Sequence, residues 1–405
     1  MRKFRNYVLI VPLCTTVMVA EEISTERQHA LSNLAPKGKF VLRVEGKTRT
    51  TEYSYNNRGD RVRLGNELNA VNLNQDVFAS LAPFGAGASL GTTASSMEFE
   101  SERGEISFGY GVTDDLTVGV IMPFGTVKSK VDFSVNGANL GNNPNYNPAL
   151  APSATNLPYL PTSMGVAPIS TADIQALLTS PTYGYKPIAS TRTTGLADPT
   201  IGLLYQALKS KDSSLVLATG VDIGIAKEDD PDNLVDVPIN NGNSALRFRA
   251  EYYKNLANNW DFFAKAEYGI EFEDSVTKRV PQAGELLAPK SSTEKVKRNL
   301  GDYRSYELSV GKSVQNWRYA GRLYRLEKDA DDYTSSIGTD VTALETNTAG
   351  YANQWEAEIS WSGVDAWAKG NLAMPLIVSL AYKDTFGGKN GLDWNELYFR
   401  VTTFF

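Results

Sequence analysis

Charged residues of both signs recur on alternate positions in several segments, and they are the first candidates for a functional site. The pattern is carried by Arg247, Arg249, Glu251, Lys265, Glu267, Arg318, Arg322, Glu356, Glu358 and Arg400. Guanidinium, ammonium and carboxylate groups can pair with one another, order water or attract a charged solute. Because the two signs are mixed, we expect these residues to line a pore without strong selection for anions or cations. They could equally form paired ladders that stiffen its wall, and we expect this second role for most of them.

Groups suited to catalysis are scarce. His29 is the only histidine, and it precedes the first expected strand, far in sequence from any loop serine or aspartate. A general base is therefore hard to build, and no nucleotide-binding or zinc-binding spacing occurs. The pairs Asp229/Asp230 and Asp331/Asp332 could bind calcium through oxygen ligands or could simply be solvated. We predict no enzyme activity, no catalytic residue, no cofactor and no metal site.

Alternation of apolar and other residues is the dominant structural signal. In LTVGVIMPF, residues 116–124, every second side chain is apolar and faces one way, as in a β-strand. No apolar run after residue 20 approaches the ~18 residues that a membrane-spanning helix needs. Similar segments occupy 39–47, 106–112, 199–208, 214–225, 246–253, 260–272, 306–312, 317–326, 355–361, 376–382 and 394–405.

The links between these twelve segments alternate between short and long. The long ones cover roughly 51–103, 127–197, 227–244, 273–301 and 327–350. Short turns on one rim and long loops on the other are typical of outer-membrane barrels. The sequence thus predicts an all-β fold, a transmembrane antiparallel up-and-down β-barrel of about 12 strands with short periplasmic turns and long extracellular loops. A secreted β-sandwich is the alternative.

The N-terminus has the features of an export signal. Arg2, Lys3 and Arg5 precede an apolar run that ends at Ala20, so we predict a signal peptide over 1–20, with an N-terminal anchor as the alternative. Cys14, the only cysteine, lies inside it. The predicted mature chain then has a short periplasmic segment at 21–37 and a barrel at 38–405.

The other end of the chain predicts the same destination. WNELYFRVTTFF closes an alternating strand on Phe405, and such an ending looks like the signal read by the barrel-assembly machinery. Trp260, Trp317, Trp361 and Trp367 fall near the short-turn rim, where aromatic residues would meet the membrane interface. We predict a protein of the bacterial outer membrane, with membrane lipid and the assembly machinery as partners.

The loop at 127–197 is rich in proline and asparagine and should be largely irregular. One helix is expected in STADIQALL, capped by Ser170 or Thr171. We consider two roles for this loop: a constriction folded over the mouth, or a lid that packs only on neighbouring loops. In the first role the vestibule would be formed by Tyr146, Tyr159, Leu160, Ile174, Leu177, Leu178, Tyr183 and Tyr185.

Two quoted stretches carry a family resemblance. FGYGVTDDLTVGVIMPF (108–124) and GLADPTIGLLYQ (195–206) resemble the outer-membrane transporter family labelled phenol-degradation meta-pathway proteins, and more remotely the channels for hydrophobic substrates. The resemblance implies passage of small, often aromatic or hydrophobic, molecules. The segment 21–37 is short and polar, unlike the N-terminal plug of the better-known hydrophobic-substrate channels.

These observations together predict an outer-membrane channel for passive uptake of small hydrophobic or aromatic molecules. Twelve strands should leave a narrow lumen. The alternative is a structural or adhesive barrel whose long loops bind a surface partner. The formal net charge of -6, without a strongly basic stripe, argues against nucleic acid as a partner.

Overall fold

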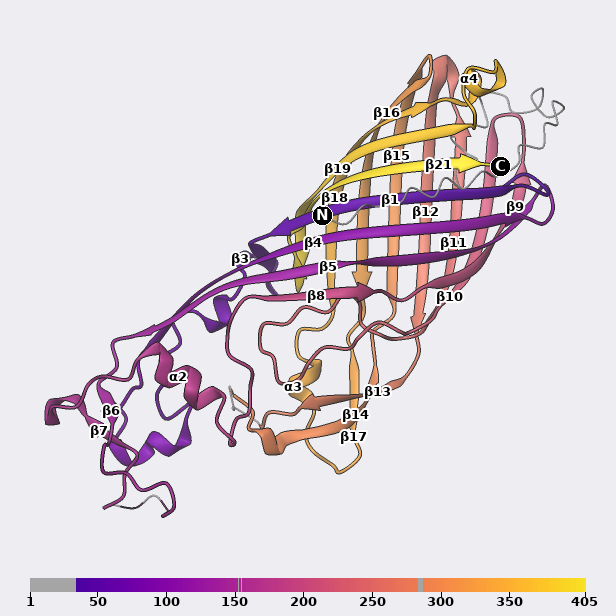
Figure 1. The fold of residues 1–405 in the computed structure, drawn as a ribbon. Helices are drawn as coiled ribbons and strands as arrows, with labels where there is room; N and C mark the ends of the chain where they lie inside the picture. The colour runs from indigo at the N-terminus through magenta and orange to yellow at the C-terminus, as the bar shows by residue number, and fades with distance from the viewer. Residues whose placement is uncertain (1–33, 152, 154, 283–286) are drawn as a thin grey trace, which may run out of the picture.

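The computed structural model describes residues 34–151, 153, 155–282 and 287–405. The expected signal peptide, and residues 21–33 of the expected periplasmic segment, lie outside these ranges. Twelve antiparallel strands of the described chain close into a barrel (Figure 1). Around the barrel they are β1 (Phe40–Thr51), β4 (Thr92–Gly111), β5 (Leu116–Asn136), β9 (Thr200–Lys209), β10 (Ser213–Asp222), β11 (Ala245–Asn255), β12 (Trp260–Glu271), β15 (Tyr303–Val314), β16 (Trp317–Lys328), β18 (Gly350–Ser362), β19 (Leu376–Lys389) and β21 (Asn395–Phe404).

The predicted fold class and strand number are confirmed. Links 112–115, 210–212, 256–259 and 315–316 are tight turns at one rim, where α4 (Val364–Ala368) and the C-terminus also lie (Figure 1). Trp260 and Trp317 begin strands at this rim with exposed rings, whereas Trp367 lies on α4 and not on a strand.

The outer face of the barrel is apolar, as the alternation predicts. On β21, Leu397 and Phe399 are about half exposed, while Glu396 and Tyr398, which alternate with them, are buried. Lipid replaces water around such a surface, so exposure of these side chains costs nothing in the membrane. In the part of the chain that the structure describes, no helix is both long enough and apolar enough to cross a membrane.

The seam that closes the barrel joins the first and last strands. β1 and β21 pair from Val41 opposite Phe404 to Thr50 opposite Asn395. The backbones of Phe40 and Phe405 exchange hydrogen bonds of 2.8 and 3.0 Å, and their rings lie 5.8 Å apart. Every spanning strand therefore has two neighbours, which removes unpaired backbone groups from the lipid.

The chain enters β1 along the inner face of the barrel. Leu34 and Ala35 are buried, and the Ala35 N–H donates to the Thr117 hydroxyl at 2.9 Å. Gly111 is necessary for this approach, because a Cβ at that position would lie 2.1 Å from the Pro36 carbonyl oxygen.

Strands β4 and β5 are longer than expected and project beyond the barrel (Figure 1). Their ladder runs from Gly111 opposite Thr117 to Thr92 opposite Asn136, so parts of the expected loops are strand. On the projecting part Lys128 and Lys130 pair with Glu100, Glu102 and Glu98. An apolar stripe is needed only within lipid. The alternation of apolar residues therefore stops where the β4–β5 hairpin leaves the membrane.

The loops contain short elements of their own. Within them β2, β3 and β20 form one small sheet, β13, β14 and β17 a second and β6 and β7 a third, while β8 extends the edge of β5. The bounds are β2 (Tyr53–Tyr55), β3 (Arg61–Arg63), η1 (Asn66–Leu68), η2 (Ala79–Phe84), β6 (Leu140–Asn142), β7 (Tyr159–Pro161), η3 (Thr162–Met164), α2 (Thr171–Leu178), β8 (Thr191–Leu196), η4 (Ala257–Asn259), β13 (Asp274–Arg279), η5 (Lys290–Ser292), β14 (Thr293–Asn299), β17 (Asp332–Ser335), α3 (Thr342–Glu345) and β20 (Gly391–Leu392).

The expected helix is present as α2. Ser170 caps it through a reciprocal pair of hydrogen bonds with Asp173. The Ser170 hydroxyl and backbone N–H donate hydrogen bonds to the Asp173 carboxylate, and these lower the pKa of that carboxyl. Its apolar face enters a core built from loop segments and the projecting end of β5, which we call the loop core. The buried members are Leu73, Phe78, Leu81, Ala88, Leu90, Val135, Leu140, Ile169, Ile174, Leu178, Tyr185, Ile188, Val235 and Leu287.

Candidate functional site

The barrel encloses a cavity of about 480 Å³. Its lining begins at Asn255 and Asp261, beside the short turn between β11 and β12, and reaches Arg49 and Arg247 toward the loop rim. This volume falls in the range of small-molecule sites. The cavity therefore extends along most of the height of the barrel.

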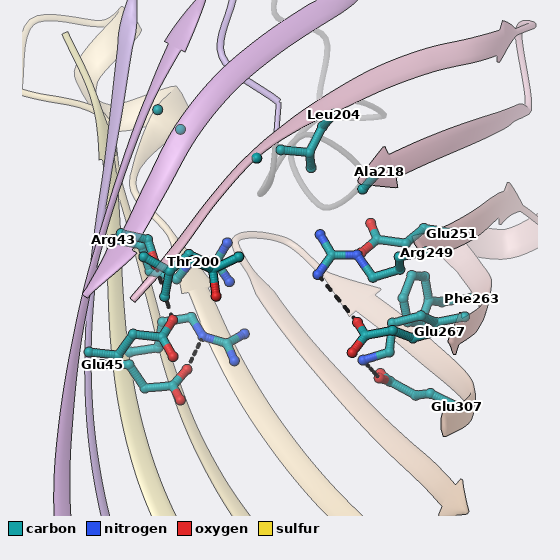
Figure 2. A pocket seen from close by; sticks show the side chains of 18 of the residues that line it. Arg43, Glu45, Thr200, Leu204, Ala218, Arg249, Glu251, Phe263, Glu267 and Glu307 are labelled. Atoms are coloured by element: carbon teal, nitrogen blue, oxygen red, sulfur yellow. Dashed lines mark hydrogen bonds and ion pairs between the residues drawn. The ribbon is translucent and has the colours of Figure 1, made fainter. Parts of the chain in front are cut away.

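The predicted pore-lining residues gather around this cavity. Glu358 does not itself line it but binds two residues that do, through contacts of 2.8 Å to Arg322 and 3.4 Å to Arg318. Figure 2 shows part of the lining, with Arg249 and Glu251 facing Arg43 and Glu45 across the space. The role of the ten predicted pore-lining residues in transport stays a prediction. The other nine, which line the cavity, are Arg247, Arg249, Glu251, Lys265, Glu267, Arg318, Arg322, Glu356 and Arg400.

Most of the charged side chains belong to one continuous surface, which we call the charged wall. It is the inner face of β1, β11, β12, β15, β16, β18, β19 and β21. Ion pairs cross between neighbouring strands, for example 2.8 Å from Lys265 to Glu307 and 2.7 Å from Arg400 to Glu45. The expected paired ladders are thus present on this wall.

Glu356 is the most deeply buried acid of the charged wall, with a fully buried side chain. Tyr324 and Tyr398 donate hydrogen bonds of 2.7 and 2.8 Å to its two oxygens, and Arg322 and Lys383 lie within 3.7 Å. A buried carboxylate is stable only when its charge and lone pairs are satisfied. These four partners fulfil that condition and tie β16, β18, β19 and β21 together.

The remaining wall of the cavity has one charged lining residue, Glu105 on β4. We call the inner face of β4, β5, β9 and β10 the smooth wall. Gly109 lies opposite Gly119, Gly119 opposite Gly202, and Gly202 opposite Gly220, so four strands present glycine in one row. Several of its other lining residues are small or apolar: Ser107, Thr117, Ile121, Thr200, Leu204 and Ala218.

The row of glycines also brings neighbouring backbones close together. A Cβ on Gly119 would lie 2.7 Å from the Phe108 carbonyl oxygen, and one on Gly202 2.5 Å from the Thr219 carbonyl oxygen. We did not predict the smooth wall from the sequence, because glycine is neither a charged nor an apolar member of the alternating pattern. Glycines at inward positions in FGYGV, TVGV, TIGL and ATGV are the signal that could have revealed it.

The GLAD segment has a structural role at the rim. Asp198 is buried, and its carboxylate accepts hydrogen bonds of 2.7 Å from the Ile225 and Ala226 backbones and one of 3.2 Å from Gly242. The motif therefore holds the loop after β10 against the start of β9.

That loop, residues 223–244, packs on the inner side of the β5 and β8 edge. Ile239 is buried against Val127 and Ala197, and the Arg103 guanidinium donates to the Ile239 carbonyl at 2.6 Å. We predicted a covering role only for the longer loop 127–197. Nothing in the alternation singles out Ile239, whose partners are distant in sequence.

The predicted vestibule residues lie elsewhere. Ile174, Leu178 and Tyr185 are members of the loop core, and Tyr159, Leu177 and Tyr183 pack on its edge. Tyr146 and Leu160 are half-buried, and none of the eight lines the cavity in the described chain. The apolar side chains pack in the loop core, as in a loop that packs on its neighbours, and the role of the eight residues in a vestibule stays a prediction.

Arg279 joins three loops at the edge of the loop core. Its guanidinium stacks 3.7 Å from the Tyr185 ring centre, donates to the Gly184 carbonyl at 3.0 Å and pairs with Asp232 at 2.7 Å. Burial raises the pKa of Asp232, but hydrogen bonds from Lys290 and Arg279 outweigh it and leave the pKa lowered. We call this group the Arg279 clasp.

The acidic loop residues considered for calcium are engaged by lysines. Asp229 pairs with Lys278 at 3.0 Å and Asp230 with Lys186 at 2.5 Å, while Asp331 pairs with Lys328. Asp332 begins β17. In the ranges that the structure covers, no three His, Cys, Asp or Glu residues are grouped to hold a metal ion.

Comparison with one solved structure shows the same fold. An outer-membrane channel from Pseudomonas putida F1 aligns with 91% of this chain and 96% of its own, at 13% identity and a TM-score of 0.53. The toluene transporter TbuX of Ralstonia pickettii aligns over 93% of both chains at 9% identity, with a TM-score of 0.36. No curated protein sequence matches the chain.

A family model matches residues 85–371, which include most strands of the barrel. The closed barrel with its apolar outer face places the protein in the bacterial outer membrane, as predicted. The chain belongs to the family described as "Putative MetA-pathway of phenol degradation", which confirms the resemblance carried by 108–124 and 195–206.

Proposed function

We propose that this protein is an outer-membrane channel for passive uptake of small hydrophobic or aromatic molecules. The observation that carries the proposal is the cavity that extends along the barrel with one wall on which Glu105 is the single charged lining residue. The family description, which refers to phenol degradation, supports an aromatic solute. The similar fold of the Pseudomonas putida channel supports conduction.

The two walls would have different roles in transport. An apolar ring can slide along the smooth wall, where the row from Gly109 to Gly220 leaves room beside the backbone. The charged wall keeps the opposite side rigid through its ion pairs. Transport follows the concentration gradient of the solute and involves no chemical reaction, in keeping with the prediction that the chain is not an enzyme.

A tryptophan in the lumen tests this function. Ala218 faces the cavity from the smooth wall, whereas Leu217 beside it is exposed on the lipid side. We expect Ala218→Trp to reduce uptake of labelled phenol or toluene by cells, because the ring fills the path, and Leu217→Trp to leave uptake unchanged. Surface expression of both variants is checked by cell fractionation.

The outcomes separate channel from adhesin. Equal uptake by both variants and the wild type would contradict a path along the smooth wall. A wild-type protein that neither conducts in planar bilayers nor changes uptake relative to a deletion strain would favour the adhesive alternative, in which the loops bind a surface partner.

We further propose that the C-terminal strand is recognised by the barrel-assembly machinery through Phe405. Its ring is more than half exposed on the outer side of the closing strand, which supports a contact before closure. Phe405→Ser should lower the amount of protein recovered in the outer membrane. Phe386→Ser, which removes another exposed ring from β19, is the control.

A further inference from the structure

The ion pairs of the charged wall are asymmetric in their exposure. In the Arg249–Glu251 pair the arginine side chain is 26% exposed and the glutamate 3%. In the pair that Arg247 forms with Asp222, at the end of the neighbouring strand β10, the values are 39% and 6%. The carboxylates thus lie deep against the wall, while the basic groups cover them and face the cavity.

The same order holds along most of the wall. It recurs in the pairs of Lys47, Arg49, Lys265, Arg322, Lys383 and Arg400 with their acids. The exception is Arg318, which is less exposed than Asp261 and lies near the short-turn rim. Among the residues that line the cavity, eleven are basic and eight acidic. Although the positive and negative charges of its ion pairs nearly balance, the charged wall therefore presents a cationic surface to a solute.

Arginines also border the smooth wall on both edges. Arg43 on β1 lies opposite Ser107 on β4, and at the other edge Arg249 and Arg247 on β11 lie opposite Ala218 and Gly220 on β10. Figure 2 shows Arg43 and Arg249 on opposite sides of the space, with Leu204 and Ala218 contributed by the smooth wall. An apolar surface is thus placed between cationic groups.

We propose that the cavity binds small amphipathic carboxylic acids, with the carboxylate held by Arg247 and Arg249 and the apolar body laid along the smooth wall. This inference rests on the proposed function and names its solute class. Arginine suits the role because its planar group binds carboxylates through two parallel hydrogen bonds. With five N–H donors, one guanidinium can bind its carboxylate partner in the wall and a solute carboxylate at the same time.

Three probes with the same ring test the inference on the purified full-length protein. They are benzoate, benzyl alcohol and benzylamine, which differ in charge, and binding is measured by titration calorimetry. We expect benzoate to bind at least about tenfold more tightly than either of the others, an ordinary gain for a charge-assisted pair. Equal or tighter binding of benzylamine or benzyl alcohol would overturn the proposal.

A charge-removing variant locates the site. Arg249→Gln should weaken benzoate binding about tenfold and leave benzyl alcohol binding unchanged. Arg304→Gln removes the same group from an exposed pair with Asp329 outside the cavity and should change neither. If Arg249→Gln binds benzoate as the wild type does, the carboxylate is not held there and the assignment is wrong.

Ion selectivity of the unmodified protein gives a second measurement that needs no variant. In planar bilayers under a potassium chloride gradient, we expect a reversal potential that indicates preference for chloride. Preference for potassium would contradict a cationic cavity surface. Uptake of phenol without benzoate selectivity would reject this inference and retain the channel, whereas absence of conductance and uptake with intact benzoate binding would reject the channel alone.

Discussion

Charged and apolar side chains are arranged in opposite ways in the barrel and in the loop core. In the barrel, acids such as Glu356 are buried inside and residues such as Leu323 are exposed outside. In the loop core, Leu81 and Ile174 are buried inside, and ion pairs such as Lys186 with Asp230 lie on the surface. The reversal follows the solvent, since lipid surrounds the barrel and water surrounds the loops.

The difference also concerns what holds each region together. The spanning strands already have complete backbone pairing, and their inner faces add buried ion pairs whose partners depend on one another. The loop core depends on close packing of apolar side chains. Damage to one region should therefore leave the other largely intact, and the following variants are ordered by the size of the expected effect.

The largest effect is expected from Glu356→Ala. Removal of this buried carboxylate leaves Arg322 and Lys383 without a shared partner, at a cost of about 3–5 kcal/mol in the free energy of unfolding. Urea unfolding of the reconstituted barrel measures it. Glu327→Ala, which breaks an exposed pair with Arg325, should cost less than about 1 kcal/mol; equal losses would show that the charged wall contributes no more than a surface pair.

Ile174→Ala should damage only the loop core. A cavity left by this buried side chain costs about 2–5 kcal/mol of local stability, so the loops should be cleaved faster by protease while urea unfolding of the barrel is unchanged. Ala176→Gly on the exposed side of α2 is a mild control, at about 1 kcal/mol. A change in single-channel conductance without faster proteolysis would instead revive the vestibule role of Ile174.

Leu323→Arg tests the lipid face of the barrel. Leu323 lies in the middle of β16 and is exposed, so an arginine there should cost about 2–4 kcal/mol in lipid. Tyr319→Arg, nearer the short-turn rim, should cost less because the charge can reach the interface. If the two variants unfold at the same urea concentration, Leu323 does not lie at membrane depth.

The smallest effect should be the pH dependence of the Arg279 clasp. The pKa of Asp232 is lowered in the folded protein, so its contribution is fully present above the usual aspartate range and is lost as the pH falls through the lowered value. Protease cleavage of the loops should accelerate in that acidic range. In Asp232→Asn the added acid sensitivity should disappear; an unchanged pH profile would exclude the clasp as its source.

The membrane-spanning part of the fold was predictable because lipid enforces a strict pattern. Each strand must show apolar residues on alternate positions, so the faces of Arg247 and Leu397 followed from their neighbours in sequence. The helix after Ser170 was also predictable, since its cap and apolar spacing are local signals.

Other features depend on contacts that sequence spacing does not encode. The projecting parts of β4 and β5 have water on their outer side, so residues such as Glu100 and Lys130 replace the apolar stripe. The smooth wall arises only when four glycine-bearing strands pair in register. The place of Tyr185 in the loop core depends on Arg279, which is distant along the chain.

The seam between β1 and β21 makes the pairing of these two strands a condition for the finished wall. A barrel that lacked β21 would leave β1 without its partner on that side. Such a barrel would keep an open strand edge, which lipid does not tolerate. The position of the seam thus couples closure of the barrel to two segments far apart in the sequence, and the hydrogen bonds between Phe40 and Phe405 fasten it at the short-turn rim.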